Sequence, residues 1–220
     1  KRRVLFLLRT RHCHKLRVKK PVLTNLELEK IRHIKTNGFK TRTISLLFRC
    51  RAEKDFLNSL DRICREAEAA IKSGYTCMVL SDRGVNSEYA PLPSLLAIGA
   101  VHHHLVRKAL RTQIGIILET AEPREVHHFA LLFSYGADCI NPYLAYEAID
   151  RLIQDGEIRL SPETARNNYI KAVDKGILKI LSKMGISTLQ SYRGAQIFEA
   201  LGLHEEVVER CFAGTVSRIG

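Results

Sequence analysis

Residues 80–142 read LSDRGVNSEYAPLPSLLAIGAVHHHLVRKALRTQIGIILETAEPREVHHFALLFSYGADCINP. In this stretch, three short apolar runs alternate with two helical patterns, which indicates strands and helices in turn. Each apolar run ends in polar residues, namely Ser81-Asp82-Arg83, Glu119-Thr120 and Asn141-Pro142. Because ligands usually bind at the carboxyl ends of parallel strands, these polar residues are the first candidates for a functional site.

The same alternation of strands and helices extends to both sides of this stretch. The expected strands are residues 43–48, 75–80, 114–118, 137–140 and 187–191. The expected helices are residues 55–73, 93–110, 124–135, 142–155, 162–184, 195–201 and 205–211, preceded by a short helix that Thr24 caps and Asn37-Gly38 ends. Repeated βαβ units predict an α/β fold with a mainly parallel sheet and helices on both sides. A partial (β/α) barrel and an open doubly wound sheet both remain possible.

Composition and charge narrow the class of protein. The chain has 220 residues, of which 45% are hydrophobic and 26% charged, as in an ordinary globular domain. No apolar run approaches the roughly 18 residues that a membrane span requires, and the apolar run in KRRVLFLLRTR is too short for a signal peptide. The net charge of +12 lies mostly in residues 1–20, which hold nine basic residues and no acidic one. This distribution favours a solvated tail over an arm that binds nucleic acid or an acidic partner.

The cysteines and histidines do not form a recognisable metal-binding pattern. The six cysteines show neither a CxxC pair nor the spacing of a zinc site, and Cys64, Cys77 and Cys139 fall inside predicted helices or strands. We expect them to be buried thiols in a reducing compartment. The run His102–His104 lies within a predicted helix, where consecutive side chains point about 100° apart and cannot face one ion. The pair His127–His128 has the same problem, so no metal is predicted.

Several polar residues at the strand ends have both a structural and a functional interpretation. Asp82 and Arg83 together could hold a carboxylate or phosphate, or form an ion pair that fixes the loop. Glu119 and Glu122 could serve as an acid or a base, but as exposed loop carboxylates they are expected to be inert. The side chain of Asn141 is expected to cap the helix that follows it.

The second candidate region is the segment 191–196, SYRGAQ, between the last predicted strand and a predicted helix. Backbone N–H groups at that helix N-terminus, assisted by Arg193, could bind an anion. The alternative is a packed turn in which Gly194 eases the backbone. No glycine-rich phosphate loop of the Rossmann or P-loop type follows any predicted strand, which disfavours a nucleotide-binding enzyme.

Several long strings of the chain resemble the central domain of the glutamate synthase family. They are PVLTNLELEKIRHI, GFKTRTISLLF, LSDRGVNSEYAPLPSLLAIGAVHHHLVR, VHHFALLFSYGADCINPYLAYE, YIKAVDKGILKILSKMGISTLQSYRGAQIFEALGL and FAGTVSRIG. They occur in the family's order and cover about residues 13–220, whereas residues 1–12 do not look like the family. The resemblance is specific because the matching strings are long and unbroken.

This resemblance implies a function for the parent enzyme. Glutamate synthases make two glutamates from glutamine, 2-oxoglutarate and a reductant, which is NAD(P)H or ferredoxin. An amidotransferase domain with a cysteine nucleophile releases ammonia, and a tunnel leads it to an FMN-binding (β/α) barrel that carries an iron–sulfur cluster. The present sequence begins with Lys1 and shows no cysteine cluster, so no catalytic, cofactor-binding or metal-binding residue of the family is carried over to it.

The resemblance therefore implies a truncated piece that connects other domains and helps to channel ammonia, and that is inactive alone. Residues 1–42 are expected to form a basic tail and leading segment, 43–214 the central α/β domain, and 215–220 the start of a linker to the FMN barrel. The expected partners are the amidotransferase and FMN domains of the parent, in the cytoplasm or a plastid, with neither membrane nor nucleic acid. The candidate residues of an interface or tunnel wall are Ser81, Asp82, Arg83, Asn141, Tyr192 and Arg193. A free-standing binding module with a basic tail is the alternative.

Overall fold

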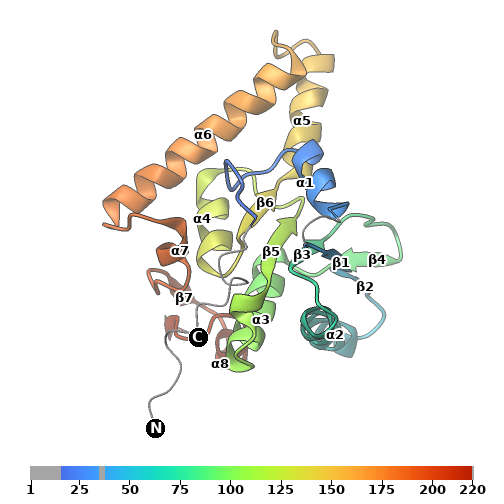
Figure 1. Ribbon diagram of the computed structural model, residues 1–220, viewed down its shortest axis with the longest axis vertical. Coiled ribbons are helices and arrows are strands. Elements are labelled where there is room, and N and C mark those ends of the chain that lie inside the picture. Colours follow the sequence, from blue (N-terminus) through green and yellow to red (C-terminus); the bar gives the residue numbers. More distant parts are fainter. Residues whose placement is uncertain (1–15, 35–37, 220) are drawn as a thin grey trace.

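A four-stranded parallel sheet lies at the centre of the computed structural model, which describes residues 16–34 and 38–219 (Figure 1). The sheet order is β1 (Thr41–Ser45), β3 (Cys77–Ser81), β5 (Gly115–Glu119) and β6 (Cys139–Asn141). The predicted α/β class with a mainly parallel sheet is confirmed. Neighbouring strands follow chain order without a reversal, and Val22 forms a parallel bridge with Ile140 at the far edge.

The helices cover both faces of this sheet, as predicted. They are α1 (Asn25–Arg32), α2 (Glu53–Lys72), α3 (Ser94–Arg107), α4 (Val126–Ser134), α5 (Tyr143–Gln154), α6 (Pro162–Lys183), α7 (Leu189–Tyr192) and α8 (Glu205–Cys211), with a 3-10 turn at Arg111–Gln113. Helices α2, α3 and α4 share a buried core with Met78, Leu80 and Ile116 on one face. Residues Leu23 and Leu28, beside and within α1, pack on the opposite face.

The first helix begins as the sequence predicts and ends earlier. The Thr24 hydroxyl accepts a hydrogen bond from the Glu27 amide, and the Glu27 carboxylate accepts one from the Thr24 amide, which makes a capping box. Helix α1 then ends at Arg32 rather than at Asn37-Gly38. Asn37 lies outside the described residues, as does Cys13.

The first predicted strand divides into two strands of different sheets. Strand β1 ends at Ser45, and β2 (Leu47–Arg49) pairs antiparallel with β4 (Tyr89–Pro91). Between them, the Leu46 amide donates to the carbonyl of Ser81 and the Leu46 carbonyl accepts from the amide of Leu92. Leu46, which joins the two strands, is fully buried. The sequence of residues 43–48 therefore looks like one apolar strand, although the chain passes from one sheet to another within it.

The sequence prediction is wrong in the C-terminal quarter of the chain. The segment predicted as a strand, 187–191, contains helix α7, whose N-terminus is capped by the Thr188 hydroxyl. The segment predicted as a helix, 195–201, contains β7 (Glu199–Leu201), which pairs in parallel with β8 (Val216–Ile219). Gly194 and Gln196 adopt left-handed backbone conformations, with φ of 72° and 53°, and these interrupt any helix there.

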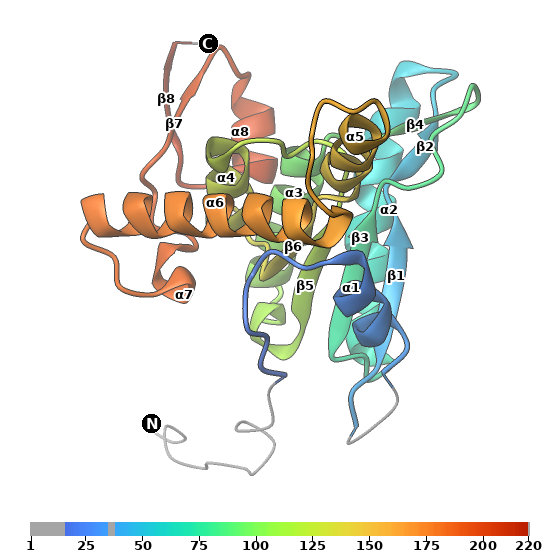
Figure 2. The same ribbon diagram turned by 90° about the horizontal axis from the view of Figure 1, so that it is seen from above.

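The C-terminal unit is held to the domain through helix α8, which packs on α3 (Figure 2). Gly99 of α3 makes this close approach possible, because a Cβ at this position would lie 2.2 Å from the carbonyl oxygen of Cys211. Figure 2 shows β7, β8 and α8 projecting from the body of the molecule. Within the described ranges, no helix combines the length and the apolar character that crossing a bilayer demands.

Candidate functional site

The polar ends of three strands meet at the carboxyl edge of the sheet. The strand register places Ser81 beside Glu119 and Glu119 beside Asn141. Because side chains alternate between the faces of a sheet, these three project toward α1, and Asp82 and Thr120 project toward α3. The carboxyl edge therefore carries two linked polar groups, one on each face of the sheet.

Glu119 binds three donors on the α1 face. Its Oε2 atom accepts from Ser81 Oγ at 2.5 Å and from Arg32 Nη2 at 2.7 Å, and its Oε1 atom accepts from Arg83 Nε at 2.8 Å. The Glu119 side chain is only 3% exposed. The expectation of an exposed loop carboxylate is therefore wrong, because Glu119 is the last residue of β5 and is buried.

Arg83 binds glutamates rather than the neighbouring Asp82. Beyond Glu119, its Nη1 atom lies 3.3 Å from Glu147 Oε1, and its guanidinium carbon lies 3.8 Å from the centre of the Tyr143 ring. The predicted ion pair between Asp82 and Arg83 is therefore wrong, because Arg83 pairs with Glu119 and Glu147 instead. Arg83 thereby ties β3 to β5 and to helix α5.

Asp82 belongs to the group on the α3 face. Its Oδ2 atom accepts from Thr120 Oγ1 at 2.7 Å and from the Ala121 amide at 2.9 Å, while its buried Oδ1 atom has no hydrogen-bond partner among the described residues. Thr120 also bonds to Ser94 Oγ at 2.5 Å. Burial raises the pKa of Tyr143, and the negative charge of Asp82 and a hydrogen bond between Tyr143 and Asp82 raise it further.

Asn141 has a different partner from the one predicted. Its Nδ2 atom donates to the Leu23 carbonyl at 3.0 Å and to Asn25 Oδ1 at 2.9 Å. It does not cap α5, whose N-cap residue is Pro142. The buried Oδ1 atom of Asn141 has no partner among the residues described, which leaves a second acceptor free at this edge.

The structure places Tyr192 and Arg193 at the opposite, amino-terminal edge of the sheet. Arg193 binds Asp138, which precedes β6 and whose Oδ2 atom accepts from the Ile116 amide. The hydroxyl of Tyr192 is buried without a partner among the described residues, and burial raises its pKa. Arg193 ends helix α7 rather than preceding a helix, so the predicted anion site at a helix N-terminus is wrong.

His102 is buried beside the same amino-terminal edge. Its Nδ1 atom accepts from Arg111 Nε at 3.0 Å. Burial lowers the pKa of His102 to about 3, and the positive charge of Arg111 lowers it further. His104 instead faces Glu68, with Nε2 and Oε2 separated by 3.3 Å. The three consecutive histidines therefore have different surroundings, as their helical spacing predicts.

We predict that His102 makes the native state less stable as the pH is lowered. In the unfolded chain this imidazole binds a proton below about pH 6.5, whereas in the native state it stays neutral down to about pH 3. Protons therefore favour unfolding, and the contribution of His102 to the free energy of unfolding should fall by up to about 1.4 kcal/mol per pH unit as pH drops between those values. Urea denaturation at several pH values should show a shallower slope for His102→Gln than for the unsubstituted chain. The exposed His33→Gln variant should keep the original slope, and equal slopes for all three proteins would contradict the prediction.

The described residues show no grouping of cysteines suited to the iron–sulfur cluster that the resemblance implies for the parent enzyme. Within the described ranges, no group of three histidine, cysteine or acidic side chains could hold a metal ion. Burial raises the pKa of Cys64 and Cys211 to about 11 and that of Cys139 to about 12, so these buried groups are neutral thiols at neutral pH in the protein without metal. Both guanidinium groups at the carboxyl edge bind Glu119.

Fold and site together define an α/β domain in which the polar side chains at the strand ends form hydrogen bonds and ion pairs mainly with one another. The family model described as "Glutamate synthase central domain" matches residues 1–204, and the chain belongs to this family. The match begins at residue 1, which corrects the expectation that residues 1–12 lie outside the resemblance.

Named relatives share this sequence over nearly its full length. Glutamate synthase [NADH] of Schizosaccharomyces pombe is 45% identical over 212 residues, which cover 94% of this chain and 10% of the relative. Glutamate synthase [NADPH] large chain of Bacillus subtilis is 44% identical, with 96% and 14% covered. The chloroplastic ferredoxin-dependent glutamate synthase of Oryza sativa is 41% identical, with 100% and 14% covered. The chain thus spans only 10% to 14% of these relatives.

Among solved structures, an L230A mutant flavocytochrome b2 with benzoylformate is similar, with a TM-score of 0.49 and 10% identity over 64% of this chain and 39% of that chain.

Proposed function

We propose that this chain is the connecting and ammonia-channelling part of a glutamate synthase. The parent reaction would convert glutamine, 2-oxoglutarate and a reductant into two glutamates. Support comes from the family match over residues 1–204 and from relatives whose names all include glutamate synthase. Those names include NADH, NADPH and ferredoxin, so they do not identify the electron donor of the parent enzyme. The proposed location is the cytoplasm, or a plastid.

The carboxyl edge of the sheet is the proposed interface or tunnel wall. The observation that carries this proposal is the pair of buried acceptors, Asp82 Oδ1 and Asn141 Oδ1, which lack donors among the described residues. Buried acceptors are nearly always satisfied by protein groups or ordered water, and we propose that here a donor comes from outside this part of the chain. A backbone or side-chain N–H of a neighbouring domain, or passing ammonia, supplies one. Ser81 and Arg83 hold Glu119 in place beside these acceptors.

Tyr192 and Arg193 form a separate proposed contact at the other edge. The Tyr192 hydroxyl and Arg193 Nε are also buried without partners in the described ranges. The two edges cannot belong to one wall, because they lie at opposite ends of the strands. We assign this second contact to the neighbouring amidotransferase or FMN domain, which are the proposed partners of the chain.

A channelling role can be tested in the parent enzyme by comparing its activity with glutamine and its activity with added ammonia. Asp82→Ala and Asn141→Leu should lower glutamine-dependent glutamate formation and increase the ammonia that escapes to solution, while activity with added ammonia is kept. Asp150→Asn, which removes a surface ion pair with Arg166, is the control and should change neither quantity. Equal losses with glutamine and with added ammonia would argue against channelling.

The same proposal expects the isolated 220-residue chain to be inactive. Flavin fluorescence titration should show no tight FMN binding, and glutamate formation from 2-oxoglutarate, ammonia and reduced flavin should not rise above background. Tight flavin binding or turnover by the isolated chain would overturn this part of the proposal. A circular dichroism spectrum with the expected helix content would show that the tested chain is folded.

A further inference from the structure

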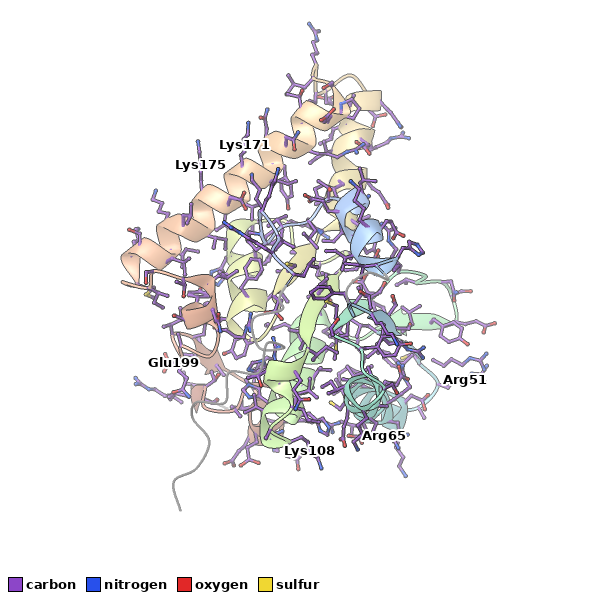
Figure 3. All side chains as sticks on the ribbon, viewed as in Figure 1. Arg51, Arg65, Lys108, Lys171, Lys175 and Glu199 are labelled. Carbon is purple, nitrogen blue, oxygen red and sulfur yellow. The ribbon has the colours of Figure 1, made fainter. Side chains whose placement is uncertain are left out.

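The outer face of α6 carries a row of four lysines. Lys171, Lys175, Lys179 and Lys183 are spaced four residues apart and are all exposed. Residues at this spacing lie on one side of a helix, with a drift of about 40° per step. The ion pairs among the described residues include none of these four lysines. Figure 3 shows Lys171 and Lys175 pointing away from the body of the protein.

The positive charge of this face is reinforced rather than balanced. Like charges four residues apart repel one another and weaken a helix. Asp174 is the only acidic residue among residues 164–183, and Lys20 Nζ binds its Oδ2 atom at 2.7 Å. The same N-terminal segment adds the exposed Arg17 and Lys19. The face therefore holds a concentration of positive charge that the described residues do not neutralise.

An apolar side chain lies beside the lysine row. Leu178 is 64% exposed, and its position falls between Lys175 and Lys179 along the helix. An apolar contact surrounded by charged side chains is typical of protein interfaces. Sites for single-stranded nucleic acid instead combine a groove with stacking aromatic side chains. Tyr169, the only aromatic residue of α6, is half-buried and its hydroxyl donates to the carbonyl of Arg124.

We propose that the outer face of α6 docks an acidic protein segment. The row from Lys171 to Lys183 extends over about 18 Å along the axis. A partner helix with Glu or Asp at every fourth position, and an apolar residue to meet Leu178, matches this length and spacing. Figure 1 shows α6 along the outside of the molecule, and its lysine row includes none of the carboxyl-edge residues, so it does not depend on the channelling proposal.

The test uses the full 220-residue chain and a labelled synthetic helical peptide with Glu at every fourth position and Leu and Ala between. Fluorescence anisotropy at low salt should show binding, and replacing all four α6 lysines with Gln should weaken it about tenfold. The matched control replaces the exposed Lys30, Lys40, Lys54 and Lys108 with Gln, which removes the same charge elsewhere. The control should change the affinity by less than about twofold. Leu178→Ser should weaken binding at high salt, where charge is screened.

Two results would overturn the proposal. One is equal affinity for the α6 variant and the control variant, which would assign binding to net charge or to residues 1–20. The other is tighter binding to a single-stranded polynucleotide of equal charge, or to anionic lipid vesicles, than to the acidic peptide. Lys and Gln have similar helix propensities, so α6 should remain folded, and circular dichroism checks this. If the fourfold variant does not fold, the Lys175→Gln/Lys179→Gln pair replaces it, with Lys54→Gln/Lys108→Gln as control.

Discussion

Replacing Arg111 with Met should lower the free energy of unfolding by about 3–5 kcal/mol, because it breaks a buried ion pair and leaves several acceptors without donors. Arg111 Nε donates to His102 Nδ1 at 3.0 Å and Nη1 donates to the Ile114 carbonyl at 2.8 Å. Nη2 donates to the Gly136 carbonyl at 2.8 Å and to Asp138 Oδ2 at 3.0 Å. Urea denaturation at neutral pH, followed by circular dichroism, measures the change.

A surface arginine provides the control for this prediction. Arg151 pairs with Asp155 four residues later on the same helix, and its side chain is 73% exposed. Arg151→Met should change the free energy of unfolding by less than about 0.5 kcal/mol. Arg111→Lys should remain strongly destabilising, since an ammonium cannot reproduce four donations in the plane of a guanidinium. Similar small losses for Arg111→Met and Arg151→Met would contradict the role given to the buried network.

Replacing Glu119 with Gln should cost about 2–4 kcal/mol of unfolding free energy. The substitution keeps the size of the side chain and removes the charge that balances Arg32 and Arg83. It also replaces one acceptor oxygen by a donor, which then faces another donor. Urea denaturation measures this loss of unfolding free energy. If the Glu119→Gln/Arg83→Gln double variant loses less than the sum of the two single variants, the two residues act together.

Glu147→Gln is the matched control for Glu119. Glu147 also contacts Arg83, but its side chain is 54% exposed, so solvent screens the pair. We expect a loss below about 0.5 kcal/mol at this position. If Glu119→Gln were as mild as Glu147→Gln, the carboxyl edge would owe little of its stability to the buried carboxylate.

The sequence predicted the central part of the fold because local signals there are strong. The apolar runs of β3, β5 and β6 are fully buried or nearly so, and the helices between them have clear apolar stripes. Prediction failed at residues 187–201, where strand and helix were exchanged. In that region, short elements and two left-handed residues decide the conformation, and hydrophobic periodicity carries little information.

Part of the candidate site could be predicted because the local sequence signals that mark the ends of the central strands are strong. The sequence located Ser81, Asp82 and Asn141 at strand ends, and the parallel register brings those ends together. It missed the part played by Glu119, because one of its partners, Arg32, is 87 residues away in sequence. The sequence also could not show that Arg193 lies at the opposite edge, since its contact with Asp138 depends on the fold of the whole C-terminal region.

The position of Val22 beside β6 sets an order for folding. The Ile140 amide donates to the Pro21 carbonyl, and the Leu23 amide donates to the Ile140 carbonyl. Asn141 reaches the same Leu23 carbonyl across a separation of 118 residues. During synthesis the first segment therefore emerges long before the strand it pairs with, and residues 21–23 cannot form this pairing until β6 has left the ribosome. Nascent chains that stop before residue 140 should lack this pairing and leave the edge of β5 exposed, which makes them better substrates for chaperones and proteases.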